Sequence, residues 1–196
     1  MARTTSRTPR RRNAAATRQA ILASARRAFA RSGFDGAGLR EIAAGAGVTA
    51  VLVNRYFGSK EKLFAEVALD TMRDPVILTP ENLAAPDFAA ALAKALVEVT
   101  TPGATPLDGF LILLHSASSP KAAKIGRAWI KRGHQATLEA AVKGRFAPER
   151  AGIFLALVAG IQVMRQMVEI PALAGAKPRE LERLLVPLIR DLVEAR

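Results

Sequence analysis

The segment that most constrains the fold is Leu39–Phe57, which reads LREIAAGAGVTAVLVNRYF. The spacing of its apolar residues predicts two short helices, one over about Leu39–Ala44 and one that follows Thr49 and ends at Phe57. Gly47 lies where the chain must turn sharply, and glycine reaches positive φ without steric cost. Thr49 has the side chain of an N-cap. Two short helices joined by a tight glycine turn predict a helix-turn-helix.

The second helix of this segment has two different faces. Val53, Tyr56 and Phe57 share one face by i,i+3 and i,i+4 spacing, so we expect them to face the core. The opposite face is small and polar, as in a helix that reads a DNA groove. The side chains that we expect to contact DNA are Arg40, Thr49, Ala50, Val51, Asn54, Arg55, Tyr56 and Lys60.

These side chains would recognise DNA in different ways. Arg55 and Lys60 are candidates for phosphate contacts, because both carry a positive charge. Ala50 and Val51 offer only apolar contact, for instance to a thymine methyl group. Asn54 can bond adenine through two hydrogen bonds or a phosphate through one, so its role stays open.

The surrounding run AFARSGFDGAGLREIAAGAGVTAVLVNRYFGSKEKLF closely resembles the N-terminal domain of the TetR family, the tetracycline-repressor-like transcriptional regulators. The resemblance covers roughly residues 17–66. It implies an all-α fold of about nine helices, with a three-helix DNA-binding domain followed by a helical domain for ligand binding and dimerisation. Gly38 stands at the N-cap where the family usually has Thr or Ser, so one usual hydroxyl contact to the backbone of DNA is missing.

Nearly all of the net charge of +12 lies in the N-terminal part of the chain. Residues 1–60 contain 12 Lys and Arg against two acidic residues, a net +10, whereas residues 61–196 contain 17 against 15, a net +2. A basic segment joined to a nearly neutral body favours a polyanion as the partner of that segment. We therefore expect the helix-turn-helix to bind double-stranded DNA.

We expect three parts in the chain: a flexible basic arm at 1–16, a helix-turn-helix DNA-binding domain at 17–60, and a helical effector-binding and dimerisation domain at 61–196. The arm contains five Arg and has three interpretations: a tail that aids solubility, an arm that contacts phosphates or the minor groove, or an organelle transit peptide. The third is disfavoured because the helix-turn-helix domain begins at once. Helical periodicity predicts further helices over about 17–32, 59–72, 88–99, 107–119, 121–143, 148–170 and 178–195.

Two of the predicted C-terminal helices carry more apolar surface than one chain needs to bury. The helix over 148–170 has a stripe of small residues, and the last helix has an uninterrupted apolar stripe. Such surfaces suit a homodimer with a two-fold axis, which the resemblance also implies and which would read a palindromic operator. The residues expected at the interface are Gly152, Ala156, Ala159, Gly160, Val163, Leu181, Leu184, Leu185, Leu188 and Leu192.

The resemblance also implies a small-molecule effector that binds in the C-terminal body and changes the spacing of the two DNA-binding domains. The sequence does not identify the ligand, and ordinary core packing competes with ligand contact at each candidate position. The candidate lining residues are Phe110, Leu114, His115, Trp129, Met164, Arg165 and Met167. Gln162, Arg165, Gln166 and Glu169 form a polar stripe that we expect at a solvated face or at the rim of the dimer.

Several classes of function are disfavoured. The chain has no cysteine, which excludes a thiolate metal site and fits a reducing cytoplasm, and its two histidines are 19 positions apart. No nucleophile elbow, phosphate-binding loop or dinucleotide fingerprint is present, so we expect no enzyme, metal or cofactor. The longest apolar run, Ile153–Met164, is shorter than the about 20 residues that span a bilayer, so we expect a cytoplasmic protein with no membrane partner.

The sequence therefore favours a sequence-specific transcriptional regulator, a homodimeric repressor that a small-molecule effector releases from DNA. Two alternatives stay open. One is an architectural DNA-binding protein that ignores sequence and has no effector. The other is an enzyme or ligand carrier with a vestigial helix-turn-helix, which the placement of the charge disfavours.

Overall fold

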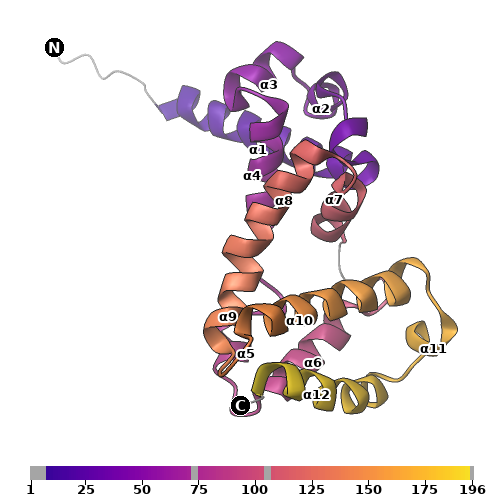
Figure 1. Cartoon of the computed structure of the whole chain (residues 1–196). Helices are drawn as coiled ribbons and strands as arrows, with labels where there is room; N and C mark the ends of the chain where they lie inside the picture. The colour runs from indigo at the N-terminus through magenta and orange to yellow at the C-terminus, as the bar shows by residue number, and fades with distance from the viewer. Residues whose placement is uncertain (1–7, 72–74, 104–106, 195–196) are drawn as a thin grey trace. The chain divides into compact units, whose positions relative to one another are not determined.

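The computed structural model describes residues 8–71, 75–103 and 107–194, and this part of the chain contains helices and no strand (Figure 1). It divides into two compact units. The first comprises residues 1–71 and 107–126, and the second comprises residues 72–106 and 127–196. The all-α fold predicted from the sequence is confirmed.

The first unit is built on the helix-turn-helix and the helices that pack on it. Its helices are α1 (Thr8–Gly36), α2 (Leu39–Gly45), α3 (Ala50–Phe57), α4 (Lys60–Asp70), α7 (Asp108–Ser116) and the first part of α8 (Pro120–Ile130). Thr49 caps α3 and Ser59 caps α4, each by accepting a hydrogen bond from the backbone N–H of the third residue of the helix. Both caps were predicted from the sequence.

The first helix is longer than expected, which corrects part of the predicted arm. Residues 8–16 are helical and continue directly into the predicted helix, whereas residues 1–7 lie outside the described part of the chain. Alanine has the highest helix propensity, and Ala14–Ala16 extend the helix ahead of its apolar stripe. The expectation of a flexible arm is therefore wrong for residues 8–16.

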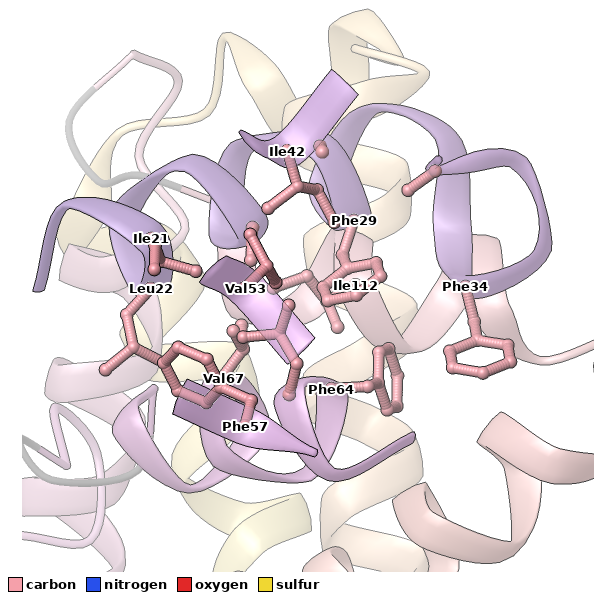
Figure 2. Packing of buried hydrophobic residues seen from close by; sticks show 14 of the residues in the cluster. Ile21, Leu22, Phe29, Phe34, Ile42, Val53, Phe57, Phe64, Val67 and Ile112 are labelled. Atoms are coloured by element: carbon pink, nitrogen blue, oxygen red, sulfur yellow. The ribbon is translucent and has the colours of Figure 1, made fainter. Parts of the chain in front are cut away.

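An aromatic cluster holds the first unit together. The rings of Phe29 and Phe34 each meet the ring of Phe64 edge-on, with centroids 5.1 and 5.2 Å apart. Edge-to-face pairs of this kind add about 0.5–1.5 kcal/mol to the free energy gained from burial. Figure 2 shows Val53 of α3 and Ile112 of α7 entering the same cluster, so helices from both parts of the sequence share one core.

A close contact joins α7 to α1 at Gly33. Gly33 has φ 65° and ψ −175°, which breaks the regular helical conformation within α1. A Cβ atom at this position would lie 2.3 Å from the carbonyl oxygen of His115. The next residue, Phe34, donates its backbone N–H to Ser116 Oγ at 2.9 Å, and Arg26 pairs with Asp108 at 3.1 Å near the other end of α7. Both ends of α7 are therefore fixed to α1.

The second unit contains the C-terminal helices. Its elements are α5 (Pro80–Leu83), α6 (Phe88–Val99), α9 (Ala136–Ala141), α10 (Ala147–Gln162), α11 (Pro171–Ala174), α12 (Pro178–Glu194) and two π-helical segments, η1 (Lys131–Gln135) and η2 (Val163–Met167). The predicted helices over 88–99, 148–170 and 178–195 match α6, α10 with η2, and α12. The one-turn helices α5 and α11 and both π-helical segments were not predicted.

One stripe of α12 forms much of the core of the second unit. Leu181, Leu185, Ile189 and Val193 recur every four residues and are buried, together with the apolar face of α6. Arg150 of α10 is also buried, and it donates hydrogen bonds to the carbonyl oxygens of Lys143 and Leu192, both at 2.7 Å. This arginine ties the start of α10 to the end of α12.

The contact at Gly33 predicts a large cost for adding a side chain there. Gly33→Ala places a methyl group against the His115 carbonyl, in a backbone conformation that is essentially restricted to glycine. We therefore expect the free energy of unfolding to fall by more than about 3 kcal/mol. Gly47→Ala is the matched control, because φ is 66° but the space for a Cβ is open, and it should cost about 1–2 kcal/mol. Chemical denaturation measures both. Equal losses would show that the contact with α7 contributes nothing.

Candidate nucleic-acid interface

The two helices of the motif are joined by a short, well-defined turn. Gly47 has φ 66°, and Val48 donates its backbone N–H to the carbonyl oxygen of Ala43 at 2.9 Å. Thr49 Oγ1 then accepts from the backbone N–H of Leu52 at 3.3 Å and starts α3. The positive φ and the cap predicted from the sequence are confirmed. The turn fixes the direction of α3 relative to α2.

Burial of one face of α3 decides which of its side chains are free. Val53 and Phe57 are buried in the core, whereas Val51, Asn54 and Arg55 are exposed. Val51 is exposed by 79%, more than any other large apolar side chain described. The free face of α3 therefore presents an isopropyl group, an amide and a guanidinium group.

Three of the residues expected to contact DNA are less exposed than Val51, Asn54 and Arg55. Ala50 and Tyr56 are half-buried and pack against the core of the first unit. Lys60 is half-buried, with its Nζ 4.8 Å from the centre of the Phe34 ring and within 3.5 Å of the Asp35 carbonyl oxygen. Their proposed role in DNA contact stays a prediction. Helical spacing alone did not reveal that Ala50 packs against the core.

Several arginines of the first unit form ion pairs with acidic side chains. Arg18 pairs with Glu66, and Arg31 pairs with Glu41. Arg40 and Arg55 are exposed and make no hydrogen bond or ion pair with another residue that the structure describes. These two unpaired cations and the exposed Thr49 lie on α2, on α3 and at the turn between them.

The acid nearest to this surface in sequence is already engaged. Glu41 Oε1 accepts from Arg31, and Glu41 Oε2 lies 3.4 Å from the backbone nitrogen of Gly38 at the start of α2. An acid in the first turn of a helix is also stabilised by the helix dipole. The negative charge of Glu41 is therefore compensated, while the charges of Arg40 and Arg55 remain available to a polyanion.

The candidate effector residues on α7 belong to the first unit. Phe110 is half-buried, Leu114 is exposed, and the Nδ1 atom of His115 lies 2.7 Å from the carbonyl oxygen of Ala30 in α1. The imidazole of His115 is thus engaged with α1. Its sequence position next to Leu114 gave no sign of this contact, because Ala30 lies 85 residues away.

Arg165 lies in a place that the sequence did not predict. It is only 2% exposed, and it donates from Nη1 to the carbonyl oxygen of Val97 at 2.5 Å and to Thr100 Oγ1 at 2.9 Å. Its Nε also lies 3.2 Å from the carbonyl oxygen of Leu173. A cation is favoured at the C-terminal end of a helix, here α6. The expectation that Arg165 lies on a solvated stripe is wrong.

Trp129 has a buried indole with an unpaired donor. Its side chain is 7% exposed, and its Nε1 has no hydrogen-bond partner among the described residues. The ring of His134 meets the indole edge-on, with the centroids 6.1 Å apart. Burial lowers the pKa of His134 below its ordinary value of 6.5, so the imidazole is neutral in the folded protein near pH 7.

An apolar surface runs along α10 and α12 of the second unit. Leu184 and Leu188 of α12 are exposed by 67% and 55%. Gly152 and Gly160 of α10 are exposed, and the space in which a Cβ of either would lie is open. Other exposed apolar residues in or next to α10 and η2, which the sequence did not single out, are Phe146, Ile153 and Val168.

Not every residue expected at a dimer interface is on this surface. Leu181 and Leu185 are each 5% exposed and pack in the core of the second unit. Ala156 is exposed, while Ala159, Val163 and Leu192 are half-buried. The sequence analysis placed Leu181 and Leu185 in the same apolar stripe as Leu184 and Leu188. In the structure the former pair faces inward.

The apolar helix extends beyond the apolar run Ile153–Met164 at both ends. Ala147–Met167 is one helical stretch of 21 residues with a mean hydropathy of 1.3 over its most apolar window, and 17% of that window is buried. In the described part of the chain it is the one helix long and apolar enough to cross a membrane by those two measures. Length and composition alone are weak support for a span, because an apolar helix that packs against another protein passes the same test.

Two family profiles match the chain. The profile described as "Bacterial regulatory proteins, tetR family" matches residues 21–67, which contain α2 and α3. The profile described as "Tetracyclin repressor-like, C-terminal domain" matches residues 87–193, more than half of the chain. No match was found among curated proteins.

Solved structures of similar proteins cover nearly the whole chain. A TetR-family regulator from Streptomyces coelicolor A3 is 25% identical, with a TM-score of 0.59 over 91% of this chain and 95% of that protein. NalD of Pseudomonas aeruginosa, the secondary repressor of the MexAB-OprM multidrug efflux pump, is 25% identical with a TM-score of 0.62, over 91% and 96% of the two chains. Salmonella enterica GusR has a TM-score of 0.72 over 91% and 96% of the chains, and at 18% identity it shows the fold alone.

The environment of His134 predicts a pH dependence of stability. Because folding lowers its pKa, the unfolded chain binds the proton more readily, and stability falls as the pH drops through the unfolded value near 6.5. We expect the thermal midpoint of the His134→Gln variant to change less between pH 7 and pH 5 than that of the wild type. Calorimetry at several pH values measures this difference. Parallel pH profiles would mean that folding does not shift the titration of His134.

Proposed function

The chain belongs to the TetR family of DNA-binding transcriptional regulators, and we propose that it is a homodimeric repressor that binds a palindromic operator and is released by a small-molecule effector. The observation that carries the proposal is the exposed face of α2 and α3, where Arg40 and Arg55 have no partner among the residues that the structure describes. NalD, which is similar to this chain, is a repressor by its description. DNA as the partner favours the cytoplasm as its location.

The helix-turn-helix supplies the two requirements for reading a base sequence. Positive charge holds the protein against the phosphates, and side chains on the free helix face reach base edges. Arg40 and Arg55 meet the first requirement, and Val51 and Asn54 meet the second. Thr49 lies at the start of α3, where its hydroxyl and the neighbouring backbone amides suit a phosphate.

The homodimer is supported by the apolar surface of α10 and α12. Exposed patches of this kind mark interaction sites in proteins that are otherwise well packed. The small residues Gly152, Ala156 and Gly160 let a second helix approach closely, while Leu184 and Leu188 supply apolar area. A two-fold axis makes such a surface complementary to itself, because each stripe meets its copy.

The effector is the part of the proposal with the least structural support. Family membership favours a ligand site in the C-terminal domain, and Trp129 offers a buried donor that has no partner in the described part of the chain. Arg165 is a poor candidate for an acidic ligand, because it is buried and its Nε and Nη1 already donate to Leu173, Val97 and Thr100. We propose that the effector weakens DNA binding, as in a repressor that is induced.

Binding to the DNA upstream of its own gene tests the regulator directly. We expect the protein to bind this DNA at least about a thousandfold more tightly than a scrambled duplex of equal length, as specific DNA-binding proteins do. Fluorescence anisotropy at two salt concentrations measures both affinities. Equal affinities with one electrostatic salt slope would instead indicate an architectural protein.

Removing the charge of Arg55 should weaken binding to the same duplex. Each lost phosphate contact lowers the salt slope by about 0.9, so Arg55→Ala should lower it by about 1.8 for a dimer. Lys124→Ala is the matched control, because Lys124 is exposed on α8 and has no ion pair with a described residue. Equal slopes for the two variants would exclude a phosphate contact by Arg55.

A charge on the apolar surface should break the dimer. Leu188→Glu places carboxylates where two copies would bury Leu188, so we expect a monomer at concentrations where the wild type is a dimer. Val76→Glu is the control, since Val76 is 56% exposed but lies outside α10 and α12. Analytical ultracentrifugation gives the mass of each. A Leu188→Glu variant that stays dimeric would place the interface elsewhere.

A further inference from the structure

The exposed face of α3 contains one side chain without any polar group. Val51 lies in the first turn of the helix, two residues after the capping residue Thr49. Its isopropyl group is 79% exposed, while Val53 is 1% exposed in the core. A single exposed apolar side chain is common on proteins and has no meaning by itself. Here the same helix-turn-helix also carries exposed cations that suit a polyanion.

The groups around Val51 favour contact with a base rather than with the phosphate backbone. Arg40 on α2 and Arg55 at the end of α3 are the unpaired cations of this surface, and Glu41 is compensated by Arg31. Asn54 follows Val51 by three residues, so both lie on one face of the helix. The cations can contact phosphates, whereas an apolar side chain has no group with which to bind a phosphate and can gain only from contact with an apolar group on a base.

The major groove offers one apolar group to such a side chain. Thymine carries a methyl group at C5, whereas the unmodified edges of the other bases carry hydrogen-bond donors and acceptors. Valine has one strongly preferred rotamer in a helix, so little side-chain entropy is lost when it docks. The cap at Thr49 and the burial of Val53 and Phe57 hold the helix that carries it.

We propose that Val51 reads a 5-methylpyrimidine in each operator half-site, with thymine as the natural base. The inference rests on the proposed function, because it names the group that the DNA-binding surface selects. By the same chemistry, 5-methylcytosine at that position presents the same methyl group to Val51. Asn54 reads a neighbouring base or phosphate through its amide and is independent of the methyl group.

Deoxyuridine substitution tests the contact, because it removes the methyl group and keeps the base pair. In the bound upstream duplex, each thymine is replaced in turn, and affinity is measured by fluorescence anisotropy. Loss of one buried methyl group should weaken wild-type binding about fourfold in one half-site and about sixteenfold in both. Replacing the same thymine by 5-methylcytosine should leave binding about fourfold tighter than replacing it by cytosine.

Two variants assign the effect to a residue. Val51→Ala should bind more weakly and should no longer distinguish uracil from thymine at that position. Asn54→Ala, the matched control on the same face, should bind more weakly but keep the fourfold penalty. The inference is overturned if no thymine methyl group affects wild-type binding, or if Val51→Ala keeps the penalty. Failure of the proposed function is a different result, because the wild type would then not distinguish the upstream duplex from scrambled DNA.

Discussion

Burial of Val53 and Phe57 in the core of the first unit determines what the DNA-binding surface can be. Because these two side chains are fixed inward, the rotation of α3 about its own axis is fixed as well. Val51, Asn54 and Arg55 are left outside by the same geometry. An eight-residue helix would not be stable alone, so its order comes from this core and from the cap at Thr49. The capacity to read DNA thus depends on residues that never touch it.

Local features of the fold could be predicted from the sequence. The turn at Gly47 and the caps at Thr49 and Ser59 depend on residues a few positions apart, and their chemistry is specific to those positions. Helical periodicity likewise located the main helices of both units. The π-helical segments were missed because their apolar pattern differs little from that of an α-helix over five residues.

Long-range contacts could not be predicted in the same way. The approach of His115 to Gly33 and the hydrogen bonds of Arg165 to the end of α6 join residues 82 and 65–68 positions apart, and nothing in the local sequence marks them. Helical spacing placed Arg165 on a polar stripe that was expected at a solvated face or at the rim of the dimer. The structure buries it where backbone carbonyls at a helix end replace water. Of the site, the exposed face of α3 was predicted, but the inward lean of Ala50 was not.

The π-helical segment η2 has a consequence for how α10 is compared with related helices. Val168 donates its backbone N–H to the carbonyl oxygen of Val163, five residues earlier, so this turn holds one residue more than an α-helical turn. By the end of η2 the side chains are therefore rotated by about 100° from the positions that regular helical counting would give them. A relative without this extra residue would align with the chain through a one-residue gap near the end of this helix, and its last turn would present different side chains.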